Sequence, residues 1–78
     1  MKMEKQIFED TSIVAFLSLK GFKITPQKLD NGRIIFSVEG ENITQALQDL
    51  YNNEKVGVLD FIKSIKGVRS FIFAFKGR

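Results

Sequence analysis

The sequence predicts a small α+β domain, in the order short strand, helix, β-hairpin, helix and long C-terminal helix. Three observations support this prediction. Apolar residues recur with helical spacing before Gly21 and again after Glu41. Between these stretches, two β-rich segments flank the turn sequence Asp-Asn-Gly at residues 30–32. The length of 78 residues is that of a single domain, which we expect to span residues 1–78.

The first expected elements are a short strand at residues 5–9 and a helix at residues 11–20. Asp10 and Thr11 are both favourable N-cap residues, and an apolar helical stripe follows them. Gly21 is expected to end the helix, because glycine readily takes the left-handed conformation found just beyond a C-cap.

A β-hairpin is expected next, and its loop length decides which side chains share a face. A three-residue loop pairs Ile24 with Val38 and gathers the apolar residues of both strands on one face, whereas a two-residue loop mixes the faces. We therefore predict a type I turn with Gly32 in the left-handed position. Pro26 lacks an N–H donor, so its strand is expected at a sheet edge or at a bulge.

A second helix is expected at residues 42–52. Asn42 is its predicted N-cap, and Gln45 follows three residues later, as in a capping box. The helix has a five-position apolar stripe that we expect to pack in the core: Ile43, Ala46, Leu47, Leu50 and Tyr51.

The last segment permits two interpretations. Apolar residues from Val58 to Ile72 follow a helical period, which favours one long helix. Gly67, however, could end a helix after Lys66, and residues 69–76 have the composition of a strand. Composition by itself leaves these alternatives about equal.

Four stretches of the chain resemble a known family: FEDTSIVAFLSLKGFKI, DNGRIIFSVEG, LYNN and DFIKSIKGVRSFIF. Together they are similar to a family of small uncharacterised domains found in bacterial and phage genomes. The resemblance implies that the last segment is mainly helical, which favours a helix at about residues 58–74. It implies no activity, and no functional residue can be transferred from it.

Several classes of function are disfavoured by composition. The chain has no cysteine and no histidine, so it lacks thiolate ligands, disulfides and the commonest general base. No Gly-x-Ser-x-Gly elbow or phosphate-binding glycine loop is present. We therefore expect a non-catalytic protein without a metal or cofactor. No signal peptide or membrane span is recognisable, so a cytoplasmic location is expected.

Charge is distributed unevenly along the chain, whose net charge is +3. Residues 55–78 contain a single acid, Asp60, but six cations, whereas acids outnumber bases before residue 55. Such a basic segment favours an acidic partner, foremost nucleic acid or a nucleotide phosphate. The candidate binding residues are Lys63, Lys66, Arg69, Phe73, Lys76 and Arg78.

If the last segment is a helix, two of its faces carry large apolar residues. Phe61, Ile65, Val68, Ile72 and Phe75 form the face assigned to the core. The second face carries Ile62, Lys66, Arg69 and Phe73, and exposed apolar groups of this kind usually mark an interaction surface.

Two uses fit this second face. Its cations could grip phosphates while Phe73 stacks on a base. We expect the protein to be a homodimer or higher oligomer. Ile62 and Phe73 could therefore be buried between copies, or alternatively against another protein, as in a phage or host accessory factor. Sequestration of a small anionic nucleotide between subunits is a variant. If the segment is a strand instead, Arg69, Phe71, Phe73 and Phe75 share one face.

Overall fold

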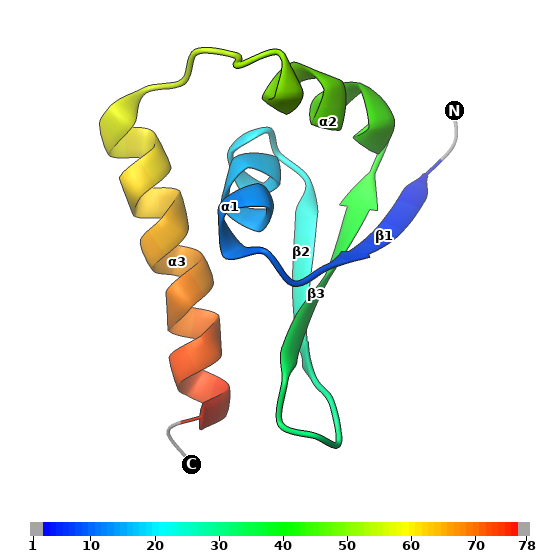
Figure 1. The fold of residues 1–78 in the computed structure, drawn as a ribbon, viewed down its shortest axis with the longest axis vertical. Coiled ribbons are helices and arrows are strands. Elements are labelled where there is room, and N and C mark those ends of the chain that lie inside the picture. The colour runs from blue at the N-terminus through cyan, green and yellow to red at the C-terminus, as the bar shows by residue number, and fades with distance from the viewer. Residues whose placement is uncertain (1–2, 77–78) are drawn as a thin grey trace.

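The computed structural model describes residues 3–76, and its elements follow the predicted α+β order (Figure 1). Three strands form one antiparallel sheet in the order β1-β3-β2, with β3 in the centre. The last segment is one helix, so the alternative of a helix followed by a strand is wrong. The elements are β1 (Glu4–Phe8), α1 (Thr11–Leu19), β2 (Lys23–Lys28), β3 (Ile34–Gly40), α2 (Ile43–Tyr51) and α3 (Val58–Lys76).

The hairpin of β2 and β3 has the predicted register. Ile24 lies opposite Val38, and the Leu29 N–H donates to the carbonyl of Arg33 at 2.8 Å. Gly32 closes the loop with a φ of 87°, in the left-handed region that glycine enters without a steric penalty. The three-residue loop is therefore confirmed, because only this register turns the apolar side chains of both strands to the same side.

Helix α1 begins and ends at the predicted signals. The Asp10 carboxylate accepts hydrogen bonds from the N–H groups of Ser12 and Ile13, at 2.8 and 3.3 Å, and so caps the first turn. Gly21 has a φ of 97° and reverses the chain. Phe22 then folds back against the core, as expected after a left-handed C-terminal cap.

The helices all belong to one side of the sheet. Phe36 and Val38 of β3 point to that side and are fully buried, packed against residues of α1, α2 and α3. Helix α3 runs along α1, and α2 spans the end of the domain near the start of β1 (Figure 1). Because side chains alternate along a strand, Ile35, Ser37 and Glu39 point to the opposite side, where no helix packs in the described part of the chain.

The start of α2 differs from the prediction. Asn42 has a φ of 61° and makes no side-chain capping bond, and the Gln45 amide donates to Asp49 at 3.0 Å. The N–H of Ile43 instead donates to the Glu4 carboxylate of β1, at 3.0 Å. The predicted capping box is therefore wrong, because a residue 39 positions away in sequence satisfies the first turn.

The apolar stripe of α2 is narrower than predicted. Ile43 and Ala46 are buried, and Leu47 and Leu50 are partly buried against the same core cluster. Tyr51, however, is 74% exposed, so its assignment to the core is wrong. It occupies the last position of the helix, where no other element reaches far enough to cover it.

Helix α3 continues through Gly67 because its packing extends to both sides of this residue. Val68 is 2% exposed and lies in a core cluster with Val14 and Ala15 of α1. The Ser64 hydroxyl donates to the carbonyl of Ala15 at 2.6 Å, which ties the two helices together. Burial of these contacts outweighs the cost of a helical glycine, about 1 kcal/mol relative to alanine.

Candidate nucleic-acid interface

The second face of α3 is exposed along the length of the helix. Ile62 is 41% exposed and Phe73 74%, and Lys66 and Arg69 between them are exposed as well. Figure 1 shows α3 as the long helix at the left margin, with α1 on one side and no element on the other. We call the side chains Leu59, Ile62, Lys66, Arg69 and Phe73 the α3 stripe.

The core face of α3 determines where this stripe points. Phe61, Ile65 and Ile72 pack partly buried against the cluster that contains Val68. Since 3.6 residues make one turn, the stripe is displaced from these residues by about a third of a turn, which points it to solvent. Burial of the core face is therefore enough to leave the stripe exposed to solvent, and the stripe residues need no special backbone conformation.

Leu59 was not recognised as part of this surface from the sequence. It is 69% exposed and lies three residues before Ile62, so the stripe has alternating steps of three and four residues. The same spacing could have identified it from the sequence, as a position equivalent to Ile62 one turn earlier. The stripe is thus apolar at both ends and cationic in the middle.

The exposed cations of α3 have no acidic partner among residues 3–75. Ion pairs in this part of the chain join Lys20 to Asp49 and Glu54, and Arg33 to Glu9. Lys63, Lys66 and Arg69 take part in none of them, and all three are exposed. Their positive charge is therefore not neutralised by a neighbouring carboxylate.

Asp60 is the one acid of α3, and it lies in the first turn. There it interacts favourably with the positive end of the helix dipole, one to three turns away from Lys66 and Arg69 along the axis. The middle of the helix is consequently purely basic.

Two further predicted residues lie at the end of the chain. Lys76 is the last residue of α3. Arg78 lies outside the described residues. Five of the six candidate residues thus lie on α3: Lys63, Lys66, Arg69, Phe73 and Lys76.

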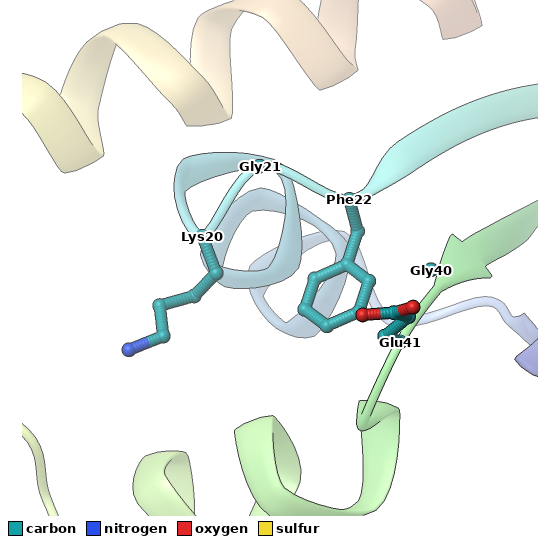
Figure 2. A pocket seen from close by; sticks show the side chains of 5 residues that line it. All are labelled: Lys20, Gly21, Phe22, Gly40 and Glu41. Atoms are coloured by element: carbon teal, nitrogen blue, oxygen red, sulfur yellow. The ribbon is translucent and has the colours of Figure 1, made fainter. Parts of the chain in front are cut away.

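A separate shallow hollow of about 180 Å³ lies between the end of α1 and the end of β3. Figure 2 shows the Phe22 ring inside it, with the Glu41 carboxylate beside the ring and the Lys20 side chain extending away. The Lys20 ammonium contacts the Glu54 carboxylate at 2.9 Å. This hydrogen bond with Glu54 raises the pKa of Lys20 above 10.5.

The hollow is a gap between closely packed groups rather than a binding pocket. A Cβ on Gly40 would lie 2.3 Å from the Phe22 ring, so ring and backbone are in close contact. Lys20 is held by Glu54, and the remaining polar side chain is that of Glu41. No pair of groups suited to proton transfer or nucleophilic attack meets here. Among residues 3–76, no cluster of three carboxylates could hold a metal ion.

A family model described as a domain of unknown function, DUF5659, matches residues 5–74. The chain belongs to the DUF5659 family. The match runs from β1 to nearly the end of α3 and includes the whole α3 stripe, so the stripe is part of the DUF5659 domain itself. The bacterial or phage distribution expected from the sequence resemblance stays a prediction.

Comparison with curated proteins and with solved structures found no match. The DUF5659 description names no activity. Among the described helices, none has both the length and the hydropathy needed to cross a membrane.

Proposed function

We propose that this DUF5659 domain is a non-catalytic module that binds nucleic acid along the α3 stripe and the neighbouring Lys63. The observation that supports the proposal is the combination of Lys63, Lys66 and Arg69, exposed and without an acidic partner, with the 74% exposed ring of Phe73. Cations and an exposed aromatic side chain are what proteins use to hold a phosphate backbone and stack on its bases.

The dimensions of the helix fit a phosphate backbone. At 1.5 Å per residue, Lys63 and Arg69 are separated by roughly 9 Å along the axis, which is the length of two to three nucleotides of one duplex strand. Phe73 follows Arg69 by four residues, so it lies one turn further along the same side. A base attached to a phosphate held by Arg69 is within its reach. Lys76 and Arg78 follow in the sequence and would add positive charge to this contact.

The charge of the stripe favours a polyanion over a second copy of α3. Side-by-side pairing of two copies in parallel register would place Lys66 against Lys66 and Arg69 against Arg69. In the antiparallel arrangement centred on Lys66, the same cations again meet at the middle. Like charges that face each other are destabilising, so the occupant of this surface is expected to supply negative charge.

A protein partner is the second candidate, and the apolar ends of the stripe favour it. Leu59 and Ile62 are 69% and 41% exposed, and phosphate contacts do not account for them. An acidic partner, or a dimer that encloses a small anionic nucleotide, could cover Ile62 and Phe73 while it neutralises Lys66 and Arg69. Apolar groups of this kind typically lie at the centre of protein interfaces.

A fluorescence titration with single- and double-stranded oligonucleotides at two salt concentrations tests the main proposal. Binding has to weaken steeply with salt, because each phosphate contact releases counterions. For duplex DNA, Lys66→Gln with Arg69→Gln should lower the salt slope by about two units, at roughly 0.9 per contact. Phe73→Ala should weaken single-strand binding by about 1–3 kcal/mol and leave the salt slope unchanged.

Lys23→Gln is the matched control, since Lys23 is an exposed cation on β2 rather than α3. It should bind like the wild type. Absence of binding at low salt, or equal binding by the double variant and the wild type, would overturn the proposal. In that case, a change of mass in light scattering on Phe73→Glu would assign the stripe to a protein partner.

A further inference from the structure

Strand β1 is a free edge of the sheet. It pairs with β3 on one side, and among residues 3–76 its own backbone N–H and C=O groups bond to no other element. The opposite edge, β2, contains Pro26, as predicted for an edge strand, and proline has no N–H to offer a further strand. An edge without such protection can pair with a strand of another chain.

The hydrogen bonds of the β2–β3 hairpin show which backbone N–H and C=O groups of β1 point away from the sheet. Residues that face each other in an antiparallel pair alternate between those that exchange backbone bonds and those that do not. The bond from Leu29 to Arg33 places positions 35, 37 and 39 of β3 in the bonded pairs with β2. The even-numbered positions therefore bond toward β1, where they face Glu4, Gln6 and Phe8.

It follows that Lys5 and Ile7 direct their N–H and C=O groups away from the sheet. Their side chains lie on the face that carries no helix, and Glu9 continues the same alternation just beyond the strand. All three side chains are exposed, and Ile7 is 51% exposed. The free edge thus presents a cation, an apolar group and an anion in that order.

We propose that β1 pairs antiparallel with β1 of a second copy, about a two-fold axis at Ile7. In this register Ile7 faces Ile7, and Lys5 of each copy faces Glu9 of the other, so the helix-free face carries an opposite-charge pair at both ends. Glu4 and Asp10 also face each other, but each carboxylate already accepts a hydrogen bond within its own copy, from the N–H of Ile43 and of Ser12. If the axis is shifted to Gln6, Lys5 and Glu9 no longer face each other and both face uncharged residues. If it is shifted to Lys5, Lys5 of one copy faces Lys5 of the other. Cross-strand pairs of opposite charge stabilise a sheet, whereas like charges destabilise it.

The resulting sheet has six strands, in the order β2-β3-β1-β1-β3-β2. Arg33 already contacts Glu9 within each copy, so the Glu9 carboxylate would lie between Arg33 and the Lys5 of the other copy. Helix α3 contacts β2, which is the edge strand opposite β1 in each copy. The α3 stripe therefore stays exposed in the dimer, at both ends of the extended sheet.

Sedimentation equilibrium over a concentration series tests this interface. The wild type should form a dimer. Lys5→Glu and Glu9→Lys should each raise the dimer dissociation constant roughly tenfold, because each turns two attractive pairs into repulsive ones. The double variant Lys5→Glu with Glu9→Lys restores the opposite-charge pairs and should recover wild-type dimerisation.

Ile7→Pro is a second test, since it removes an N–H that β3 does not use. The variant should keep the circular dichroism spectrum of the fold and sediment as a monomer. Lys23→Glu, a charge reversal at the other edge of the same face, should dimerise like the wild type. A wild type that stays monomeric, a double variant that does not recover, or a dimer that Phe73→Glu abolishes while Ile7→Pro does not would each overturn the proposal.

Discussion

Replacement of Gly67 by alanine tests whether α3 is one continuous helix. Gly67 lies in the interior of a 19-residue helix and is exposed. A Cβ placed on it meets no atom within 4 Å, so the added methyl group creates no clash. The full difference in helix propensity is then gained, which is about 0.8–1.0 kcal/mol. For a domain of this size, that gain raises Tm by about 4–8 °C.

Thermal unfolding followed by circular dichroism measures this gain, with Gly21→Ala as the matched control. Gly21 has a φ of 97°, where a side chain is strained, so the same substitution should lower Tm there by a similar amount. An unchanged or lowered Tm for Gly67→Ala would refute the reasoning. It would show that the chain near Gly67 is not helical in solution, as in the alternative of a helix followed by a strand.

Four further predictions can be checked by the same unfolding experiment. Gly40→Ala should lower stability by about 1–3 kcal/mol, because the new Cβ would lie 2.3 Å from the Phe22 ring. Glu4→Ala should cost about 1 kcal/mol through loss of the acceptor for Ile43, while Glu4→Gln, which keeps an acceptor oxygen, should cost less. Ser37→Ala should be neutral or stabilising, since the buried Ser37 hydroxyl has no hydrogen-bond partner among the described residues. The hydrogen bond with Glu54 raises the pKa of Lys20 from 10.5. The stabilisation from this pair is therefore complete below pH 10.5 and is lost as the pH rises through the folded-state pKa. The Tm difference between the wild type and Lys20→Met should shrink over that pH range.

The local elements could be predicted because their signals lie within a few residues of each other. Asp10 and Gly21 mark the limits of α1, and both act through bonds or dihedral angles of the adjacent backbone. The hairpin register followed from the requirement that Ile24 and Val38 share a face. Short-range geometry decides such features, so no tertiary information was needed.

The start of α2 could not be predicted for the opposite reason. The capping box of Asn42 and Gln45 is locally plausible, but β1 brings Glu4 to the first turn across 39 positions of sequence. The exposure of Tyr51 is similar, because helical spacing identifies a stripe but does not show where the neighbouring element ends. Both depend on the placement of other elements.

The candidate site was partly accessible from the sequence. Helical spacing separated Ile62, Lys66, Arg69 and Phe73 from the core face, and the structure leaves all four exposed. The lack of carboxylates around the cations required the structure, since the acids of residues 1–54 could have folded against α3. The free edge of β1 likewise became visible only from the strand order.

The sequence by itself determined the order of elements as far as α2, the limits of α1, the hairpin register and, for a helical last segment, the two faces of α3. These features depend on spacing, turn residues and local dihedral preferences, which act over a few residues. The tertiary structure alone decided that α3 passes through Gly67, that Glu4 completes α2, that β3 is central, and that the cations of α3 are unpaired within residues 3–75. Each of these depends on contacts between residues distant in sequence, where packing outweighs local preference.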